Sequence, residues 1–480
     1  MNYIAILHIL GWILGMEGIF MILPLATAVI YQEKAGLWFA VCIVLCGLAC
    51  WIMTRPKQKN DQFRVREGYV SVALAWLVIS LMGALPFTMS GEIPSYLDAV
   101  FEIVSGFTTT GASILSDVEA LSHCMNLWRC FSHWVGGMGV LVFVLAILPL
   151  AGGGSSFALM QAESPGPSVS KLVPHLKATA QNLYLIYTGL TAIQVVLLLL
   201  GGMPLFDSLC HAFGSAGTGG FGIMNDSLAG YSTYSQVIIT IFMVMFGVNF
   251  EFYYLCLVRR GKDAWRIEEV RWYLILFFGS SLAIGINLYL QQGGHFLYDL
   301  QQAAFQVASI MTTTGFSSCN FDLWPGFSQM LLVILMFIGA CAGSTGGGLK
   351  VSRVILYIKA SVREARSIIR PREISVVRLN GERVENVVLR SALMFLAAYL
   401  FVFVISILIV SLNGTDFTTS FTAVTATINN IGPGFAGVGP TCNYGFLSPL
   451  SKIVLTFDML AGRLEIFPML ILLFPSTWKK

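Results

Sequence analysis

Charge is scarce in this sequence. Asp, Glu, Lys and Arg make up 11% of the 480 residues, hydrophobic residues make up 56%, and the mean hydropathy is +0.76. Soluble domains usually carry about 25% charged residues, so the composition excludes a water-soluble globular protein. The 34 Phe and 10 Trp residues exclude a disordered chain, which cannot carry so much apolar surface. The remaining class is a membrane protein that crosses the bilayer several times.

Patterns that hold metals or catalyse reactions are also missing. The ten cysteines include no C-x-x-C pair, and the six histidines are scattered without ligand-like spacing. Cys42, Cys46 and Cys50 recur at every fourth residue, which indicates one helix face of small buried side chains. A G-x-G-x-x-G match at 217–222 follows an apolar membrane segment and not a strand, so it does not indicate a dinucleotide site. With no cluster of His, Asp or Glu in the apolar segments, we expect that the protein is not an enzyme.

Long apolar runs are present instead. A helix needs about 20 apolar residues to cross the hydrocarbon core, and unbroken runs favour helices over the alternating strands of a barrel. Two predicted spans contain charges: 3–31 contains Glu17, and 448–475 contains Asp458, Arg463 and Glu465. Eight others contain no Asp, Glu, Lys or Arg: 35–54, 69–91, 130–162, 178–206, 227–250, 272–298, 323–349 and 391–415. The sequence therefore predicts an all-α polytopic membrane protein with ten spans.

The basic residues predict the orientation. Of the 28 Lys and Arg residues, 23 lie on one alternating set of loops and termini. The other set of loops has only Lys34, Arg129 and Lys452. Because cytoplasmic loops carry the excess of Lys and Arg, we expect both termini and the basic loops in the cytosol.

An internal repeat lies on the side with few basic residues. Four segments each begin at an Asp and end at a Gly, with Asp-to-Gly spacings of 13, 13, 16 and 16 residues: 98–111, 207–220, 299–315 and 416–432. Each lies between two spans, and its semi-polar part is too short to cross a bilayer. We therefore predict four units of helix, re-entrant pore loop and helix around a central pore, after two additional N-terminal spans.

The ends of these re-entrant helices predict a cation site. Four helix C-termini that point inward would each present about −0.5 charge, and a terminal glycine lets the backbone turn its carbonyl groups toward an axis. The predicted ligands are the residues of four loops: Thr109, Thr110 and Gly111; Thr218, Gly219 and Gly220; Thr313, Thr314 and Gly315; Asn430, Ile431 and Gly432. One T-T-T-G copy alone would indicate a capped helix end, whereas four copies on one side favour a selectivity filter.

The chemistry of the loops favours potassium. They contain no acidic residue, and cages of neutral carbonyl groups suit potassium, whereas rings of Asp or Glu are typical of divalent-selective pores. Each loop carries one central glycine and no T-V-G-Y-G stretch, so we expect looser selectivity than in tetrameric potassium channels. Potassium, as the transported ion, is the only metal ion that we expect, and we expect no cofactor.

A glycine-rich segment inside the span 323–349 predicts a gate. Each glycine in a helix costs roughly 1 kcal/mol relative to Ala, so this span should break below the filter. This is the only clear break that we predict, and close packing of small residues is the alternative explanation. An intramembrane charge, Arg463, could bond to the loop or repel potassium, with Asp458 and Glu465 as its counter-ions, and Lys350 could cap a helix or face the cytosol. The predicted gate residues are Gly343, Ser344, Thr345, Gly346, Gly347, Gly348, Lys350 and Arg463.

Several motifs together resemble the Trk/Ktr/HKT superfamily of potassium transporters, and its bacterial Trk branch in particular. They are the four loops, A-G-S-T-G-G-G-L-K at 342–350, N-N-I-G-P-G at 429–434, G-R-L-E-I-F-P at 462–468 and E-S-P-G-P at 163–167. The resemblance covers the whole chain. It implies potassium uptake across the bacterial inner membrane, a homodimer and a cytosolic nucleotide-binding regulatory subunit of the Trk-A type. The second loop, with Gly219 after Thr218, and the fourth, with Asn430 and Ile431, depart from T-T-T-G.

These expectations divide the chain into five parts: two N-terminal helices with a basic loop at 1–66, and pore repeats at 67–160, 161–260, 261–385 and 386–480. The basic segment 353–390 should dock either a protein partner or anionic membrane lipid, and we expect no nucleic-acid partner. Coupling to protons or sodium stays open. The alternative function is a cation-coupled secondary carrier for another solute, although such carriers usually have broken spans in paired positions.

Overall fold

The computed structural model describes residues 1–56, 65–139, 176–372 and 375–479. The second half of the predicted span 130–162, most of the basic loop at 55–66, the E-S-P-G-P motif at 163–167 and Lys171 lie outside the described residues.

The regular secondary structure in the described part of the chain is almost entirely helical. Its strands form one antiparallel hairpin, β1 (Arg378–Leu379) and β2 (Glu382–Arg383). Among the described residues, six helical segments are long and apolar enough to cross a membrane, or seven if a bent pair counts as one span. The all-α prediction is therefore confirmed, but fewer than ten of the predicted spans are continuous long helices.

The first helices form a group beside the repeats. They are α1 (Tyr3–Phe20), α2 (Ile22–Ile30) and α3 (Gly36–Thr54), and α1 packs on both α3 and α4. A Cβ atom added at Gly15 would lie 2.9 Å from the Cys50 sulfur, and one at Gly18 would lie 3.1 Å from the Cys46 Cβ. The cysteine stripe of α3 therefore packs against a glycine stripe of α1, as small residues do where helices approach closely in membranes.

Four units with the same order of helices follow. The long first helices are α4 (Val65–Gly83), α10 (Leu176–Leu200), α15 (Glu268–Gln292) and α19 (Asn386–Ser411). The short helices are α6 (Tyr96–Phe107), α11 (Leu205–Gly217), α16 (Phe296–Met311) and α20 (Phe417–Ile428). The second helices are α7 (His123–Gly137), α12 (Thr233–Gly247), α17 (Gly326–Ile338) and α21 (Pro449–Arg463). Short connecting elements are α5 (Leu85–Ser90), α14 (Gly261–Ala264), η4 (Phe321–Leu323) and η5 (Ala436–Val438), and the last element is the short helix α23 (Pro475–Trp478).

The packing of these units closes into a circle. The second helix of each unit packs on the short helix of the next: α7 on α11, α12 on α16, α17 on α20, and α21 back on α6. This cyclic order arranges the four short helices around one centre.

The second helices are interrupted in more than one unit. They have 13–15 residues, or about 20–23 Å at 1.5 Å per residue, which is less than the roughly 30 Å of a hydrocarbon core. α12 bends by 91° into α13 (Phe250–Leu257), α17 ends at Gly339, and α21 ends before α22 (Phe467–Leu473) at Glu465 and Ile466, which both have positive φ. The prediction of a break only in the third unit was therefore wrong. No residue between α12 and α13 has positive φ, and two residues after α21 do, so neither of these breaks is marked by a glycine run.

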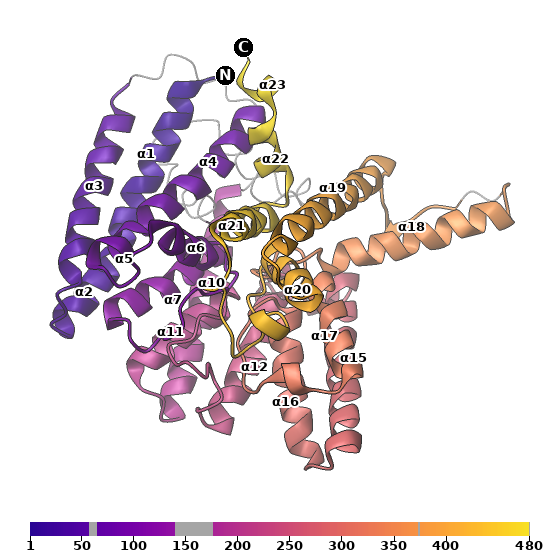
Figure 1. Cartoon of the computed structure of the whole chain (residues 1–480). Helices are drawn as coiled ribbons and strands as arrows, with labels where there is room; N and C mark the ends of the chain where they lie inside the picture. Colours follow the sequence, from indigo (N-terminus) through magenta and orange to yellow (C-terminus); the bar gives the residue numbers. More distant parts are fainter. Residues whose placement is uncertain (57–64, 140–175, 373–374, 480) are drawn as a thin grey trace.

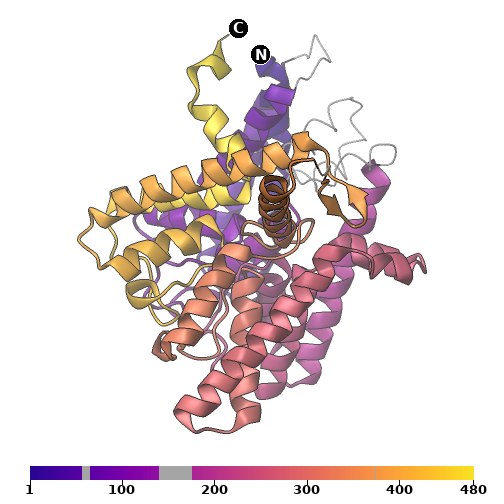
Figure 2. The same cartoon turned by 90° about the vertical axis from the view of Figure 1, so that its right-hand side faces the viewer.

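Both termini lie at the same end of the molecule (Figure 1). α18 (Val351–Ile369) follows the break in the third unit and extends away from the remaining helices in Figure 1, and Figure 2 shows it nearly end-on.

Candidate functional site: a ring of four loops and the loop beneath it

The four predicted loops share one backbone path. We call the segments 109–111, 218–220, 313–315 and 430–432 the ring loops. Their first residues have φ between +52° and +58°: Thr109, Thr218, Thr313 and Asn430. Their glycines have φ between +76° and +97°: Gly111, Gly220, Gly315 and Gly432. The N–H groups of the middle residues, Thr110, Gly219, Thr314 and Ile431, each donate to the carbonyl five residues earlier, over 2.8 Å. The Gly219 and Ile431 departures from T-T-T-G therefore leave the backbone path unchanged.

The ring loops touch one another in cyclic order. A Cβ atom at Gly111 would overlap the carbonyl oxygen of Gly219, and one at Gly220 would overlap that of Thr314. A Cβ at Gly315 would likewise overlap the carbonyl oxygen of Ile431, and one at Gly432 would lie 2.7 Å from that of Thr110. Each glycine thus abuts a carbonyl group of the next loop, and the fourth loop closes on the first. The structure brings all twelve predicted ligand residues into this ring.

The surroundings of the ring suit a cation. α6, α11, α16 and α20 end just before the loops, so their partially negative C-terminal ends face this region. The threonines of the ring loops are at most 1% exposed, whereas Gly111, Gly220 and Gly315 are half-buried. Solvent therefore reaches the ring at these three glycines, whereas Gly432 is buried.

At the far end of α20, Asp416 is the N-cap, and bonds from the hydroxyl and N–H of Thr419 lower the pKa of its carboxyl group.

Hydroxyl groups hold the ring loops to their helices. The Thr108 hydroxyl donates to the Val104 carbonyl over 2.6 Å and lies 2.8 Å from the Thr110 hydroxyl, and Thr312 and Thr314 repeat this arrangement. In the fourth loop, the side-chain amide of Asn430 donates to the Thr110 hydroxyl and to the Met459 carbonyl, both over 2.9 Å. Asn430 thus ties the fourth loop to the first loop and to α21.

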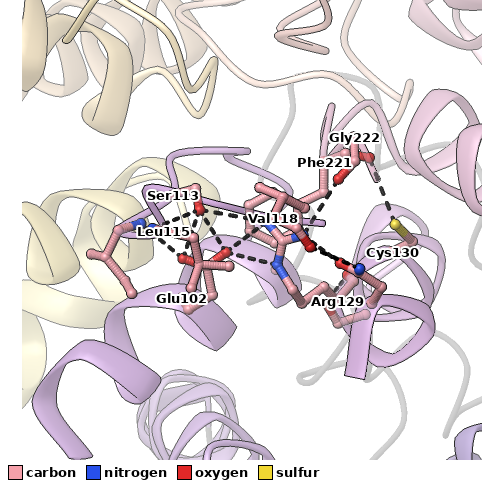
Figure 3. A network of polar contacts seen from close by, with 12 residues as sticks. Glu102, Ser113, Leu115, Val118, Arg129, Cys130, Phe221 and Gly222 are labelled. Atoms are coloured by element: carbon pink, nitrogen blue, oxygen red, sulfur yellow. Dashed lines mark hydrogen bonds and ion pairs between the residues drawn. The ribbon is translucent and has the colours of Figure 1, made fainter. Parts of the chain in front are cut away.

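A buried ion pair links the parts of the chain that lie next to the first two ring loops (Figure 3). Glu102 on α6 and Arg129 on α7 are both at most 1% exposed, and their charged atoms lie 2.7 Å apart. Ser113 also donates to Glu102, and Arg129 donates to the Gly222 carbonyl over 3.4 Å, with its guanidinium 4.2 Å from the centre of the Phe221 ring. The ion pair therefore connects α6 with the segment after Gly220.

Two charges that the sequence placed on outer loops lie elsewhere. Arg129 is inside α7, and Lys452 is in α21, where its ammonium group lies 2.6 Å from Asp98 on α6. Spacing along the chain could not reveal this, because Arg129 and Lys452 find their acidic partners on another helix. Both residues form ion pairs between helices, Arg129 with Glu102 and Lys452 with Asp98.

Replacing Arg129 with Met should lower the stability of the protein by about 3–5 kcal/mol, because the buried Glu102 carboxylate loses its counter-ion. Thermal unfolding in detergent would measure this loss. The matched control is R260M, because Arg260 is exposed, and it should change stability by less than about 1 kcal/mol. The double variant E102Q/R129M should recover part of the loss. If R129M unfolded at the same midpoint temperature as the control, the Glu102–Arg129 ion pair would not stabilise the protein as described.

The glycine-rich break forms a loop directly under the ring. We call residues 343–350 the glycine loop. The Gly347 N–H donates to the Thr313 hydroxyl over 2.6 Å. A Cβ atom at Gly347 would overlap the Asn429 carbonyl oxygen, and one at Gly346 would lie 2.8 Å from that of Thr312. Glycine is therefore required at these two positions, because the backbone of the loop lies against the backbone that leads into the ring.

Arg463 connects the glycine loop to the first unit. Its guanidinium donates to the Thr345 carbonyl over 2.8 Å, to the Gly137 carbonyl over 2.7 Å and to the Gly136 carbonyl. The predicted bond to loop carbonyls is therefore present. The counter-ions that the sequence suggested have other partners, because Asp458 accepts from Ser406 over 2.7 Å and Glu465 pairs with Arg353.

Lys350 belongs to the same arrangement. Its ammonium group donates to the Gly346 carbonyl, and its backbone, with φ of +76°, precedes α18. Lys350 thus closes the glycine loop on itself. A cavity of about 170 Å³ lies beside the loop, and Lys350, Arg463, Glu465, Trp76 and Phe250 are among the residues that line it.

Sequence reasoning missed Glu269, which lies 74 residues before Gly343 and is 5% exposed. One of its carboxylate oxygens accepts from the Ala342 and Ser352 N–H groups over 2.7 and 2.9 Å. The only sequence signal for Glu269 was its position as an acidic residue at the start of a long apolar run. Acidic residues are also common at solvated helix N-termini, so this signal did not single it out. Among the described residues, no group of three His, Cys, Asp or Glu side chains could hold a metal ion, and all ten cysteines, which lie in the described ranges, are free.

Comparisons with known proteins agree with this architecture. The TrkH family model, described as a cation transport protein, matches residues 34–479. The Trk system potassium uptake protein TrkH of Salmonella typhimurium is 37% identical, and the alignment covers 100% of both chains. The Trk system potassium uptake protein TrkG of Escherichia coli K12 is 32% identical, with 99% of this chain and 98% of the relative covered.

The solved structures agree as well. The crystal structure of the potassium transporter TrkH from Vibrio parahaemolyticus superposes with a TM-score of 0.90 at 31% identity, over 100% of both chains. The protein is thus a multi-pass membrane transport protein and not an enzyme. The chain belongs to the TrkH family of cation transport proteins.

Proposed function

We propose that this protein takes up potassium across the bacterial inner membrane through a single-chain, pseudo-tetrameric pore whose selectivity filter is the ring. The observation that carries the proposal is the closed contact of four loops with one backbone path, each glycine against a carbonyl group of the next loop. Irregular backbone at membrane depth is stable only inside protein or along a water path, and a ring around an axis meets this condition.

Potassium is the ion that this chemistry favours. The ring loops carry neutral carbonyl and hydroxyl groups and no carboxylate, and carbonyl groups can replace the hydration shell of potassium. The names of the relatives, potassium uptake proteins of the Trk system, support the same ion. Potassium is then cargo, and the pore needs no cofactor.

The glycine loop and Arg463 form the gate in this proposal. The loop lies under the ring through the Gly347–Thr313 bond, and Arg463 holds it through the Thr345 carbonyl. Opening requires these bonds to break, and an Arg at this depth adds a positive charge that repels potassium. Lys350 stabilises the closed loop through its bond to Gly346.

The proposal also covers the orientation and the assembly of the protein. We propose cytosolic termini, a homodimer and a cytosolic nucleotide-binding regulatory subunit of the Trk-A type that docks on the basic segment 353–390. The division into two N-terminal helices and four pore repeats, at 1–66, 67–160, 161–260, 261–385 and 386–480, belongs to the same proposal. Breaks in several second helices remove one argument against a secondary carrier for another solute, but the closed ring favours an ion pore.

Two measurements test the proposed function. A bacterium that lacks potassium uptake should grow at low potassium when it carries this chain. Purified protein in proteoliposomes should take up rubidium, and repeating the assay with and without a pH gradient separates a channel from proton-coupled symport. Uptake of neither rubidium nor potassium, with intact protein in the vesicles, would exclude the proposal.

A further inference from the structure

One carboxylate holds both ends of the glycine loop. Glu269 lies in the first turn of α15, and its Oε1 accepts from the Ala342 N–H over 2.7 Å and from the Ser352 N–H over 2.9 Å. Ala342 directly precedes the loop and Ser352 follows it by two residues. The two amide groups belong to opposite ends of the loop, so a single oxygen atom joins them.

The N-terminus of α18 requires a hydrogen-bond acceptor. The Ser352 N–H is one of the first amide groups of α18, which have no partner within the helix, and a carboxylate at a helix N-terminus also interacts favourably with the helix dipole. Hydrogen bonds to an ionised acceptor are about twice as strong as neutral ones. Glu269 therefore contributes more to the position of both amide groups than a neutral side chain of equal size would.

The neighbouring residue fixes the start of α15 to the elements around α18. The Glu268 carboxylate accepts from the Lys359 ammonium group on α18 over 2.6 and 2.8 Å, and the Glu268 N–H donates to the Asn380 side chain over 2.7 Å. Asn380 lies in the turn of the β1–β2 hairpin. The oxygen that joins the loop ends is thus carried by a well-anchored helix end.

We propose that Glu269 is a positioning residue of the gate. Its carboxylate holds the two ends of the glycine loop together, so the loop stays under the ring until the hydrogen bonds from Ala342 and Ser352 to Glu269 break. The inference rests on the proposed role of the glycine loop as the gate. Glu269 does not belong to the ring, and its hydrogen bonds go to Ala342 and Ser352, which lie outside the ring loops. It should therefore act on how often the pore opens and not on which ion passes.

The test is a double-mutant cycle in proteoliposomes with four chains: wild type, E269Q, a deletion of 344–348 and the combination. E269Q keeps the size of the side chain and removes its charge. We expect E269Q to raise rubidium uptake between about threefold and tenfold, since a hydrogen bond to a charged group is worth roughly a factor of ten in an equilibrium. The ratio of rubidium to sodium uptake should stay at its wild-type value, and E269Q should add nothing in the deletion background.

Control variants keep the result interpretable. The matched control is Glu251 to Gln, the same change at an exposed residue of the nearby α13, which should leave uptake unchanged. Thermal unfolding in detergent checks folding, and if E269Q does not fold, E269D is measured in its place and should raise uptake less than tenfold with unchanged ion preference.

Each contrary result points to a different error. Wild-type uptake by E269Q, with raised uptake by the deletion, would overturn the role of Glu269 and leave the gate in place. An equal increase by E269Q in both backgrounds, or a loss of ion preference, would show that Glu269 acts elsewhere. Wild-type uptake by the deletion variant would instead overturn the proposed gate.

Discussion

Replacing Gly315 with Ser is expected to reduce the preference for potassium over sodium by about tenfold or more. Gly315 has φ of +87°, and a Cβ atom there would overlap the Ile431 carbonyl oxygen and lie 3.0 Å from the Pro433 ring. Backbone strain of this kind costs about 1–3 kcal/mol, and a factor of ten corresponds to about 1.4 kcal/mol. The serine side chain must displace the Ile431 carbonyl group of the fourth loop. The substitution therefore disturbs the arrangement of carbonyl groups that selects the ion.

Competition between rubidium and sodium in proteoliposomes measures the effect of G315S. The matched control is Gly279 to Ser, which makes the same change on the exposed surface of α15, where a Cβ atom would meet nothing within 4 Å. Unchanged selectivity in G315S, with uptake like that of the control, would mean that the ring does not select the ion.

Deleting residues 344–348 is expected to raise cation uptake by at least about tenfold. The deletion removes the Thr345 carbonyl that accepts from Arg463 and the Gly347 N–H that donates to Thr313. Two hydrogen bonds worth about 1 kcal/mol each hold the closed loop, and their joint loss shifts the equilibrium toward the open pore. Uptake should also lose most of its regulation.

A substitution in the glycine loop and a matched control test whether moving the loop, without removing it, also raises uptake. Gly347 to Ala would place a Cβ atom on the Asn429 carbonyl oxygen and push the loop away from the ring, so it should raise uptake in part. Gly261 to Ala meets nothing within 4 Å and should leave uptake unchanged. If both the deletion variant and G347A transport at the wild-type rate, the glycine loop does not gate the pore.

The sequence was sufficient for the ring because its signals are local. Each ring loop repeats an Asp, a short helix and a glycine that takes positive φ, so even Gly219–Gly220 and Asn430–Ile431 could be aligned before any contact was known. The all-helical fold followed from uncharged runs whose length matches a bilayer. The cysteine stripe on α3 was interpreted correctly for the same reason, as one face of one helix.

The features that sequence reasoning missed depend on contacts between distant segments. Glu269 and Arg129 have partners on other helices or loops, which no spacing rule reveals. The partners proposed for Arg463 were chosen by nearness in sequence, whereas its guanidinium donates to backbone carbonyls 118 to 327 residues away. The breaks after α12 and α21 lack a glycine run, and the only strained backbone there is at Glu465 and Ile466, with φ of +55° and +67°, so composition gave no warning.

The most direct test of the central claim is a rubidium difference experiment. Crystals of the protein grown in rubidium should show an anomalous scattering peak on the axis of the ring, between the carbonyl oxygens of Thr110, Gly219, Thr314 and Ile431. Crystals grown in sodium alone should lack it. An ordered ring with no rubidium on its axis, or with rubidium bound only elsewhere, would contradict the assignment of these four loops as the selectivity filter.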